Sequence, residues 1–292
     1  MEQWTIKKLL AWSVPYFQEK QIDNPRLNSE LLLAKALKLE RMDLYLQFDK
    51  IVTSAELAEF RTLIKRRLNR EPLQYILGRY DFMGLELYVE PGVLIPRPET
   101  EVLVEQLLPI IKKKKSPVKI LEIGVGSGCI PVALNHFAKK DLEYVGLEVS
   151  PEAMEIAQKN FLEHQLDTQK FNIRQVDFLQ GFPDELSDKR FDIIVSNPPY
   201  VSEEEWLDAQ PEVKEFEPKV ALVPPDGDPL RFYKKISELL PYLNPDGIIA
   251  VEMSYSNRES IKTIFSVNGN NPEIIKDYTG RERVLIMRKN NG

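Results

Sequence analysis

The sequence has 292 residues, with 39 Lys plus Arg, 45 Asp plus Glu, one Cys and 43% hydrophobic residues. At roughly 100–200 residues per domain, this length predicts two domains, each able to bury a core. The apolar and charged fractions are those of a globular protein, and they exclude a disordered, collagen-like or disulfide-built chain.

The composition also predicts a cytoplasmic protein without a membrane segment. A lone cysteine cannot form an internal bridge and suits a reducing compartment. No apolar run approaches the roughly 18 residues of a membrane span. Met1–Leu10 carries Glu2, Lys7 and Lys8, unlike a signal or transit peptide. The net charge of −6 argues against broad nucleic-acid binding, which depends on Lys and Arg.

Residues 1–80 have the pattern of short helices and predict a small all-α bundle. Pro25 begins a helix that continues through 28–39, because proline at the first helical position loses no hydrogen bond. Thr53 and Glu56 form a capping box ahead of another helix. That helix carries a basic cluster, Arg61, Lys65, Arg66, Arg67 and Arg70. The cluster is either a solvated face or a docking surface for an acidic or RNA-associated partner.

A linking β-hairpin is predicted over residues 81–96. Apolar and polar residues alternate over 85–90, Pro91-Gly92 is a turn signal, and 93–95 has the pattern of a returning strand. A helix is expected over 99–108, where Pro109 kinks it or begins to end it.

Strand-like and helix-like runs alternate through residues 97–292, which we expect to form the second domain. Strands are expected at 118–123, 144–149, 171–176, 191–196, 248–253, 273–276 and 283–288, and helices at 130–138, 151–163, 229–243 and 257–265. This alternation, with nearly continuous apolar strands, predicts an α/β fold with a parallel sheet covered on both faces. The last two strands leave no room for a helix between them and should be antiparallel.

A glycine-rich loop, Gly124-Val125-Gly126-Ser127-Gly128, lies between the first of these strands and its helix. Glycines permit positive φ and let a ligand approach the backbone closely. The dinucleotide fingerprint requires one more glycine where Cys129 stands, so the loop fits a nucleoside better than a pyrophosphate. Cys129 itself is expected to be a small buried hydrophobic residue and not a nucleophile.

Acidic residues end the next two strands. Glu148 is 24 positions after Gly124, where a carboxylate can accept both hydroxyls of a ribose. Asp177 can accept from an adenine amino group while the Phe178 ring flanks the base. Each acid alone could be a helix cap or a solvated loop residue. Together, at the carboxyl edge of an open α/β sheet, they predict a nucleoside site.

Asn197-Pro198-Pro199-Tyr200 follows the fourth strand. Alone it would be a stiff turn, but beside a nucleoside loop it suits methyl transfer to a planar nitrogen. The Asn197 side-chain oxygen and the Pro198 carbonyl can each accept one N–H of a substrate –NH2 group, which aims its lone pair and stabilises growing positive charge. Tyr200 can stack on the flat substrate, and Pro199 completes the substrate-binding set.

Glu122-Ile123 with the glycine loop, the two later acids and Asn-Pro-Pro-Tyr resemble class I S-adenosylmethionine-dependent methyltransferases acting on nitrogen. The wider chain is similar to the PrmC/HemK family, the release-factor glutamine N5-methyltransferases, in residues 70–78, 94–101, 211–213, 217–218 and 280–284. The resemblance covers nearly the whole chain. It implies a Rossmann-like methyltransferase sheet preceded by a helical domain that recognises the release factor.

The resemblance also implies a cofactor, a substrate and a set of site residues. S-adenosylmethionine would be bound by Gly124, Val125, Gly126, Ser127, Gly128, Glu148, Asp177, Phe178 and Asn197, and would leave as S-adenosylhomocysteine. The catalytic residues would be Asn197, Pro198 and Tyr200. The substrate would be the glutamine of the Gly-Gly-Gln loop in class-one release factors, which links the protein to translation termination. We expect a monomer without direct nucleic-acid contacts and without a metal, since His136 and His164 fall in no ligand-spaced cluster.

The sequence departs from the family pattern in three places. Glu148 replaces the common Asp, residues 223–229 replace a Gly-Gly-rich segment, and Glu252 lies in a Val-Glu-Met-Ser strand end. Two other functions compete with the glutamine methyltransferase. One is a nucleic-acid adenine N6-methyltransferase, which shares Asn-Pro-Pro-Tyr, and the other is a non-catalytic cofactor-binding protein.

Overall fold

The protein was analysed as a computed structural model, which describes residues 3–266 and 271–289. The chain forms two compact units. Unit 1 comprises residues 1–79 and 210–216, and unit 2 comprises residues 80–209 and 217–292. The chain therefore passes from one unit to the other at three places, after Arg79, Ala209 and Phe216.

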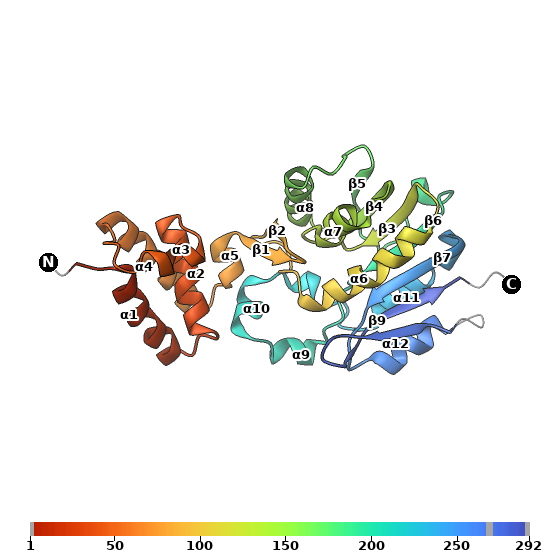
Figure 1. Cartoon of the computed structure of the whole chain (residues 1–292). Helices are drawn as coiled ribbons and strands as arrows, with labels where there is room; N and C mark the ends of the chain where they lie inside the picture. Colours follow the sequence, from red (N-terminus) through yellow and green to blue (C-terminus); the bar gives the residue numbers. More distant parts are fainter. Residues whose placement is uncertain (1–2, 267–270, 290–292) are drawn as a thin grey trace. The chain divides into compact units, whose positions relative to one another are not determined.

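Unit 1 is helical, as its sequence pattern predicts (Figure 1). Its helices are α1 Ile6–Glu19, α2 Pro25–Leu37, α3 Arg41–Leu46, α4 Ser54–Leu68, α5 Leu73–Leu77 and α10 Pro211–Phe216. The capping box is confirmed, because Thr53 and Glu56 each accept from the other's backbone N–H at the start of α4. The core of the unit is apolar and includes Phe17, Leu32 and Phe60.

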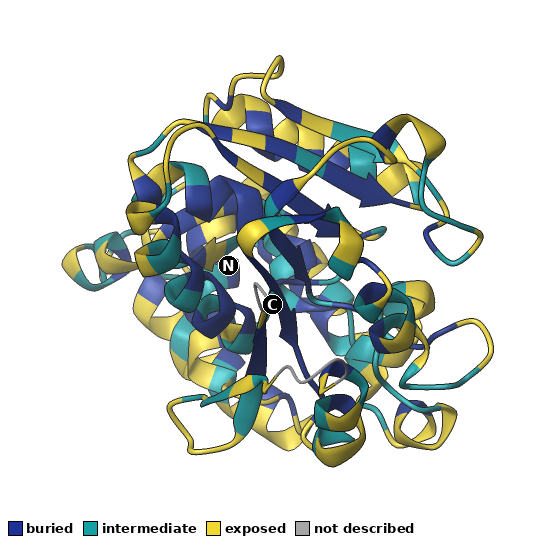
Figure 2. Ribbon diagram, turned by 90° about the vertical axis from the view of Figure 1, so that its right-hand side faces the viewer, coloured by how far each residue is buried: buried dark blue, intermediate teal, exposed yellow. Residues whose placement is uncertain are grey.

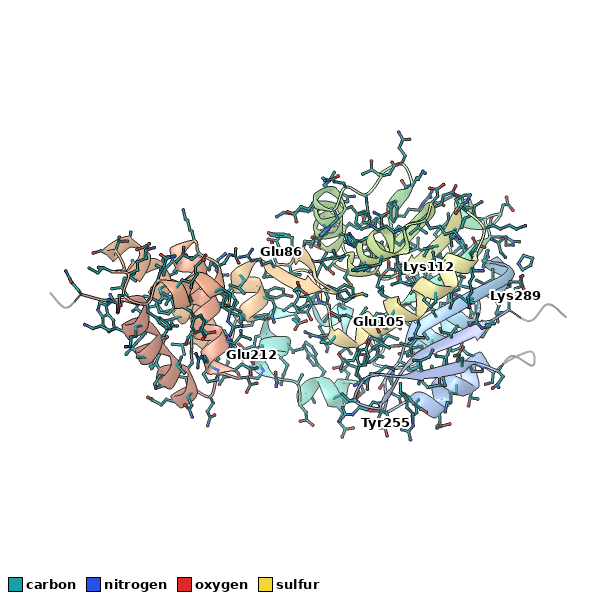
Figure 3. All side chains as sticks on the ribbon, viewed as in Figure 1. Glu86, Glu105, Lys112, Glu212, Tyr255 and Lys289 are labelled. Carbon is teal, nitrogen blue, oxygen red and sulfur yellow. The ribbon has the colours of Figure 1, made fainter. Side chains whose placement is uncertain are left out.

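The basic cluster on α4 is neither wholly a solvated face nor a free docking surface. Arg61 and Lys65 are exposed, but Arg67 is only 6% exposed. Its guanidinium donates to Asn28 Oδ1 at 2.8 Å and to Glu212 Oε1 at 3.0 Å. Glu212, labelled in Figure 3, is on α10, so the Arg67–Glu212 pair holds the distant segment 210–216 in unit 1. A partner 145 positions away cannot be found from the local charge pattern.

The linking hairpin lies earlier in the chain than the sequence pattern predicts. It consists of β1 Arg79–Phe82 and β2 Leu85–Tyr88, joined at Met83-Gly84, and residues 93–95 form no strand. Both turn residues have positive φ, +54° and +77°, as tight two-residue hairpin turns require. Glycine favours this conformation but methionine rarely adopts it, so the local sequence does not reveal this turn. Pro91-Gly92 does form a turn, as predicted, but no strand follows it.

Unit 2 contains a seven-stranded sheet in the order β5-β4-β3-β6-β7-β9-β8. Its strands are β3 Val118–Ile123, β4 Leu142–Glu148, β5 Phe171–Gln175, β6 Phe191–Ser196, β7 Leu243–Glu252, β8 Glu273–Lys276 and β9 Glu282–Arg288. The pairs among β3 to β7 are parallel, while β9 is antiparallel to both β7 and β8. Most residues of the central strands β3, β6 and β7 are buried (Figure 2), and the predicted α/β fold class is confirmed.

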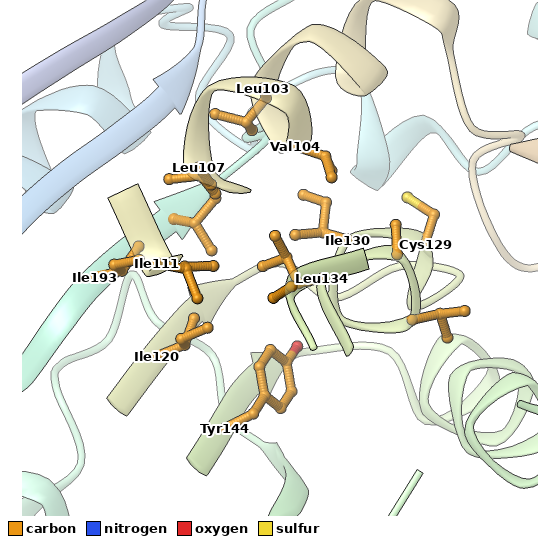
Figure 4. Close-up of a cluster of buried hydrophobic side chains, with 14 of the residues drawn as sticks. Leu103, Val104, Leu107, Ile111, Ile120, Cys129, Ile130, Leu134, Tyr144 and Ile193 are labelled. Carbon is orange, nitrogen blue, oxygen red and sulfur yellow. The ribbon is translucent and has the colours of Figure 1, made fainter. Parts of the chain in front are cut away.

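Helices cover both faces of this sheet, as Figure 1 shows. The helices of unit 2 are α6 Pro98–Lys113, α7 Cys129–Ala138, α8 Pro151–Glu163, α9 Glu203–Leu207, α11 Arg231–Ser237 and α12 Arg258–Phe265, with 3-10 turns at Asp184–Leu186, Lys219–Ala221 and Leu240–Tyr242. Figure 4 shows α6 and α7 packed through Leu107 and Leu134 onto Ile120 and Tyr144 of the sheet. The opposite face packs against α11 and α12.

Two predicted helix ends are wrong. Helix α6 continues beyond Pro109 to Lys113. The helix expected over 229–243 is shorter, because α11 ends at Ser237 and β7 already begins at Leu243. Pro241 in the connecting turn cannot donate a helical hydrogen bond, which accounts for the early end. Among the described residues, no helix has the length and apolar character needed to cross a membrane.

A buried asparagine ties the hairpin to the glycine loop. Asn160 on α8 is fully buried, and its Oδ1 accepts from the Tyr88 backbone N–H at 2.8 Å. Its Nδ2 donates to the carbonyls of Tyr88, at 3.0 Å, and Ser127, at 2.8 Å. One side chain therefore satisfies three backbone groups, buried or partly buried, from two separate segments.

Asn160→Leu should destabilise the protein, because a similar volume is kept while Tyr88 and Ser127 lose their partners. Each unsatisfied buried group costs about 1–3 kcal/mol, so we expect a loss of about 2–4 kcal/mol in the free energy of unfolding, measured with urea. Gln158→Leu, on the exposed face of the same helix, is the matched control and should change stability by less than about 0.5 kcal/mol. Equal stability of the two variants would contradict a structural role for Asn160.

Candidate active site

The register of the sheet brings the predicted site residues to one edge. Leu147, Ile123, Ser196 and Val251 form one row across β4, β3, β6 and β7. The next residue along the chain is therefore Glu148 at the end of β4, Gly124 after β3, Asn197 after β6 or Glu252 at the end of β7. Because the strands are parallel, all four residues lie at the carboxyl edge, where open α/β sheets bind their ligands.

Gly124, Glu148 and Asn197 line one cavity within unit 2, whereas Glu252 is buried and does not line it. Of the predicted cofactor residues, Gly124, Val125, Gly126, Ser127, Glu148, Asp177, Phe178 and Asn197 line it, together with Pro199, and Gly128 does not. Pro198 and Tyr200 line a smaller hollow. Asn197 lines both, so it lies where the two hollows meet.

The glycine loop and Glu148 are joined by a hydrogen bond. Gly126 has a φ of +56°, and its N–H donates to Glu148 Oε2 at 2.9 Å. Glu148 Oε1 accepts from the N–H groups of Val149, at 2.9 Å, and Ser150, at 3.0 Å. A carboxylate offers about four acceptor positions, which leaves room for one ribose hydroxyl. A second hydroxyl could bind only if the Gly126 N–H released the carboxylate.

Asp177 and Phe178 lie beyond the end of β5, as predicted. The sequence did not predict that Phe178 belongs to the apolar core or that Asp177 bonds to the Leu179 backbone. Phe178 is 4% exposed and belongs to the apolar core beneath the cavity. Asp177 Oδ1 accepts from the Leu179 N–H at 3.0 Å, so Asp177 also stabilises the turn that follows β5. Both residues line the cavity, so the capping bond and a ligand-facing position coexist.

A chain of hydrogen bonds fixes the Asn197 side chain. Its Nδ2 donates to Thr100 Oγ1 at 3.0 Å, and the Thr100 hydroxyl donates to Glu252 Oε2 at 2.7 Å. The Tyr200 hydroxyl donates to Glu252 Oε1 at 3.0 Å, so one carboxylate receives both hydroxyls. Thr100 and Glu252 are almost completely buried. The predicted residues Asn197 and Tyr200 are thus linked through two residues to which sequence reasoning gave no role.

Burial dominates the acidity of this carboxyl group. Loss of solvation raises the pKa of Glu252 to about 7, and the negative charge of Glu99 adds to the rise. The donors Thr100 and Tyr200, and the positive charge of Arg283, lower the pKa in part. Burial and the Glu252 charge in turn raise the pKa of Tyr200 well above its usual value, so the phenol remains a donor. Glu252 could have been found by the rule that identified Glu148, since it also ends a parallel strand.

Cys129 has the structural role that the sequence predicts. The thiol is buried, and burial together with the nearby Glu122 raises its pKa to about 12. It therefore stays protonated at neutral pH and is a poor nucleophile. Among the described residues, no group of three or more His, Cys, Asp or Glu side chains is placed to hold a metal ion.

The segment that departs from the family pattern borders the cavity. Pro225 lines it, as do Val220 and Ala221 just before. The approach to this segment is anchored by Glu217, whose two carboxylate oxygens accept from Arg97 at 2.7 and 2.8 Å. Arg97 and Glu217 lie in two of the stretches that resemble the PrmC/HemK family.

Comparison with known proteins shows the family of this chain. Residues 8–78 match the family model described as PrmC N-terminal domain, and residues 93–260 match the model described as N-6 DNA Methylase. The release factor glutamine methyltransferase of Geobacter sulfurreducens is 45% identical over 273 residues, covering 92% of this chain and 90% of its own. That of Rhodopirellula baltica is 36% identical, covering 98% and 97%. The chain belongs to the release factor glutamine methyltransferase family.

Solved structures support the fold of this family member. A methyltransferase from Pyrococcus furiosus has a TM-score of 0.50 at 20% identity, covering 80% of this chain and 98% of its own. The 16S rRNA N2 G1207 methyltransferase of Thermus thermophilus also has a TM-score of 0.50, at 18% identity, covering 73% and 50%. At this level of identity, the similarity supports a shared methyltransferase fold and not a shared substrate.

Gly126→Val should weaken cofactor binding, because the added side chain lies at the lining of the cavity. Valine is strained at a φ of +56°, which costs about 1–3 kcal/mol of folding stability, although no protein atom lies within 4 Å of the added Cβ. The side chain would take space at the cavity wall that the ligand needs, so S-adenosylmethionine affinity measured by calorimetry should fall about tenfold to a hundredfold. Gly84→Val is the matched control, with φ +77° and an equally open Cβ, but in the hairpin turn. Wild-type affinity in folded Gly126→Val would remove the loop from the binding site.

Proposed function

We propose that this protein transfers a methyl group from S-adenosylmethionine to the side-chain amide nitrogen of the glutamine in the Gly-Gly-Gln motif of class-one release factors. The products are N5-methylglutamine and S-adenosylhomocysteine, and the reaction modulates translation termination. One observation carries the proposal: Asn197 lines both the larger hollow with the glycine loop and the smaller hollow with Pro198 and Tyr200. Family membership agrees with it.

The residues of the larger hollow fit S-adenosylmethionine. The loop 124–128 lets the ligand approach the backbone, the Glu148 carboxylate can accept from ribose, and Phe178 offers an apolar surface to the adenine. Asp177 Oδ1 is used by Leu179, and its other oxygen can accept from the adenine amino group. When bound, the cofactor supplies a methyl group activated by a positively charged sulfur.

The residues of the smaller hollow would bind and orient the glutamine amide. Its nitrogen is a poor nucleophile, because the lone pair is delocalised into the carbonyl. Asn197 Oδ1 and the Pro198 carbonyl each accept one of its N–H groups, which holds the lone pair toward the methyl group and stabilises the positive charge growing on nitrogen. Once the new N–C bond has formed, the nitrogen proton becomes acidic and passes to solvent, so no strong base is needed beforehand.

The competing function is adenine N6-methylation of a nucleic acid, which the match to the N-6 DNA Methylase model suggests. The net charge of −6 and the pairing of Arg66, Arg67 and Arg70 with Glu71 and Glu212 disfavour it, because these cations are not free for phosphates. Incubation with labelled S-adenosylmethionine and either a release factor or DNA, followed by mass spectrometry, decides between the two. Label on neither would favour a non-catalytic cofactor-binding protein.

Asn197→Ala should lower the rate far more than cofactor affinity. It removes one acceptor for the substrate amide while the Pro198 carbonyl remains, and loss of one such preorganised interaction costs about 10²–10³ in rate. Single-turnover rates at saturating cofactor and release factor separate this effect from binding. Asn244→Ala, which removes a bond to Asp192 instead, is the control. A rate for Asn197→Ala within about threefold of wild type would make Asn197 a turn residue only.

Unit 1 is proposed to bind the release factor. Met42 and Leu46 are 70% and 82% exposed and lie four positions apart, on one face of α3. Exposed apolar side chains grouped in this way are typical of interaction surfaces. We also propose that the protein is a monomer, that it is cytoplasmic and that it makes no direct contact with nucleic acid. These proposals rest on the composition and on the lone buried cysteine.

Met42→Glu and Leu46→Glu should raise the KM for the release factor without changing kcat or S-adenosylmethionine affinity. Loss of an apolar contact of this size costs about 1–3 kcal/mol, so KM should rise about tenfold. Steady-state kinetics with varied release factor measures this change. Leu162→Glu, a 68% exposed leucine in unit 2, is the matched control. If KM stayed at the wild-type value in both unit 1 variants, this face of α3 would not be the contact.

A further inference from the structure

We propose that Thr100 and Glu252 are positioning residues that decide which end of the Asn197 amide faces the substrate. The inference rests on the proposed function, because it concerns how that site achieves its acceptor geometry. It starts from three side chains on separate elements: Thr100 on α6, Asn197 after β6 and Glu252 at the end of β7. They are joined by bonds of 3.0 and 2.7 Å.

The direction of each hydrogen bond follows from the one before it. An ionised carboxylate can only accept, so Glu252 Oε2 takes the single hydroxyl proton of Thr100. Thr100 Oγ1 can then only accept from Asn197, and only the Nδ2 end of the amide can donate. Among the described residues none donates to Asn197 Oδ1, which is therefore available to a ligand.

The orientation of the Asn197 amide matters because its two ends have nearly the same shape but opposite hydrogen-bonding character. A substrate –NH2 group needs an acceptor, and a reversed Asn197 would present N–H groups to it. The resulting repulsion would push the substrate nitrogen out of line. Shape alone does not choose between the two orientations, but a buried hydroxyl that can only accept does.

Glu252 acts on the substrate hollow through its second oxygen as well. Oε1 accepts from the Tyr200 hydroxyl at 3.0 Å, which holds the ring that lines the smaller hollow. Tyr233 contacts the same residue differently, because its hydroxyl donates to the Glu252 backbone carbonyl at 3.0 Å. Loss of the Tyr233 hydroxyl therefore leaves the carboxylate and both of its hydroxyl donors in place.

The kinetic test compares full-length variants at about pH 8, above the pKa of Glu252, with a purified release factor. Thr100→Val keeps the shape but removes the hydroxyl, and it should lower kcat about tenfold to a hundredfold with S-adenosylmethionine affinity changed less than about threefold. Thr100→Ser should restore kcat to within about threefold of wild type. Tyr233→Phe is the matched control, because it removes a buried hydroxyl that bonds to Glu252 outside its carboxylate.

A double-mutant cycle shows whether Thr100 acts through Asn197. If it does, Thr100→Val should add less than about threefold to the loss already caused by Asn197→Ala. If the fold-losses in kcat of the two single variants multiplied in the double variant, the two residues would act independently and the proposal would be overturned. Thr100→Val and Tyr233→Phe variants with equal kcat would also overturn it, because the effect would then be general destabilisation.

A second measurement does not depend on methyl transfer, so it judges the proposal even if the release factor is not the substrate. In protein labelled with ¹⁵N-asparagine, the Asn197 side-chain N–H protons should exchange with solvent about tenfold faster in Thr100→Val than in wild type or Thr100→Ser. Equal exchange in all three would mean that Thr100 does not hold the amide. If the wild-type protein did not methylate the release factor but the exchange difference was still observed, only the proposed function would be rejected.

Discussion

The register of the parallel strands is the constraint on which the rest of unit 2 depends. Because Leu147, Ile123, Ser196 and Val251 lie in one row, a single step along the chain places Glu148, Gly124 and Asn197 around one cavity. The same step from Val251 places the buried Glu252 carboxylate where it reaches Asn197 through Thr100. A slip of one residue in any pair would turn the following side chain to the other face of the sheet. The apolar cores on both faces oppose such a slip, so packing far from the cavity fixes the chemistry at its edge.

The acids at this edge are satisfied by neutral donors. Glu148 accepts from backbone N–H groups, Glu252 from two hydroxyls, and Glu122 from the Tyr144 hydroxyl at 2.6 Å. Burial raises the pKa of Glu122 well above its usual range, and the Tyr144 hydroxyl offsets part of this rise. Glu148 lines the cavity, and its hydrogen-bond partners within the described residues are backbone N–H groups and no cation. Such a site suits a cationic ligand better than an anionic one, in keeping with a sulfonium cofactor.

Ion pairs have a different use in unit 1. Arg67 is buried against Asn28 and bonds to Glu212, so a segment inserted from late in the chain is held by a charge-assisted hydrogen bond. Removing either partner would leave a buried charge unpaired, which costs more than the pair itself contributes. The segment 210–216 begins and ends where the chain crosses between the units, and Glu217 directly after it pairs with Arg97 near the cavity. The inserted segment of unit 1 is thus continuous in sequence with a residue that is paired near the cavity of unit 2.

The sequence by itself determined the α/β class, the strands of the sheet and the residues at their ends, because hydrophobic periodicity and glycine spacing are local properties. It could not place the hairpin, since Met83 adopts a backbone conformation that its side chain does not favour. It could not show that Arg67 is buried, or that Asn197 depends on Thr100 and Glu252. Asn197 and Thr100 are 97 positions apart, and Thr100 and Glu252 are 152 apart. Residues so far apart in the sequence meet only after the sheet has assembled. The hydrogen bonds between them, and the direction of each bond, are therefore decided by the tertiary structure alone.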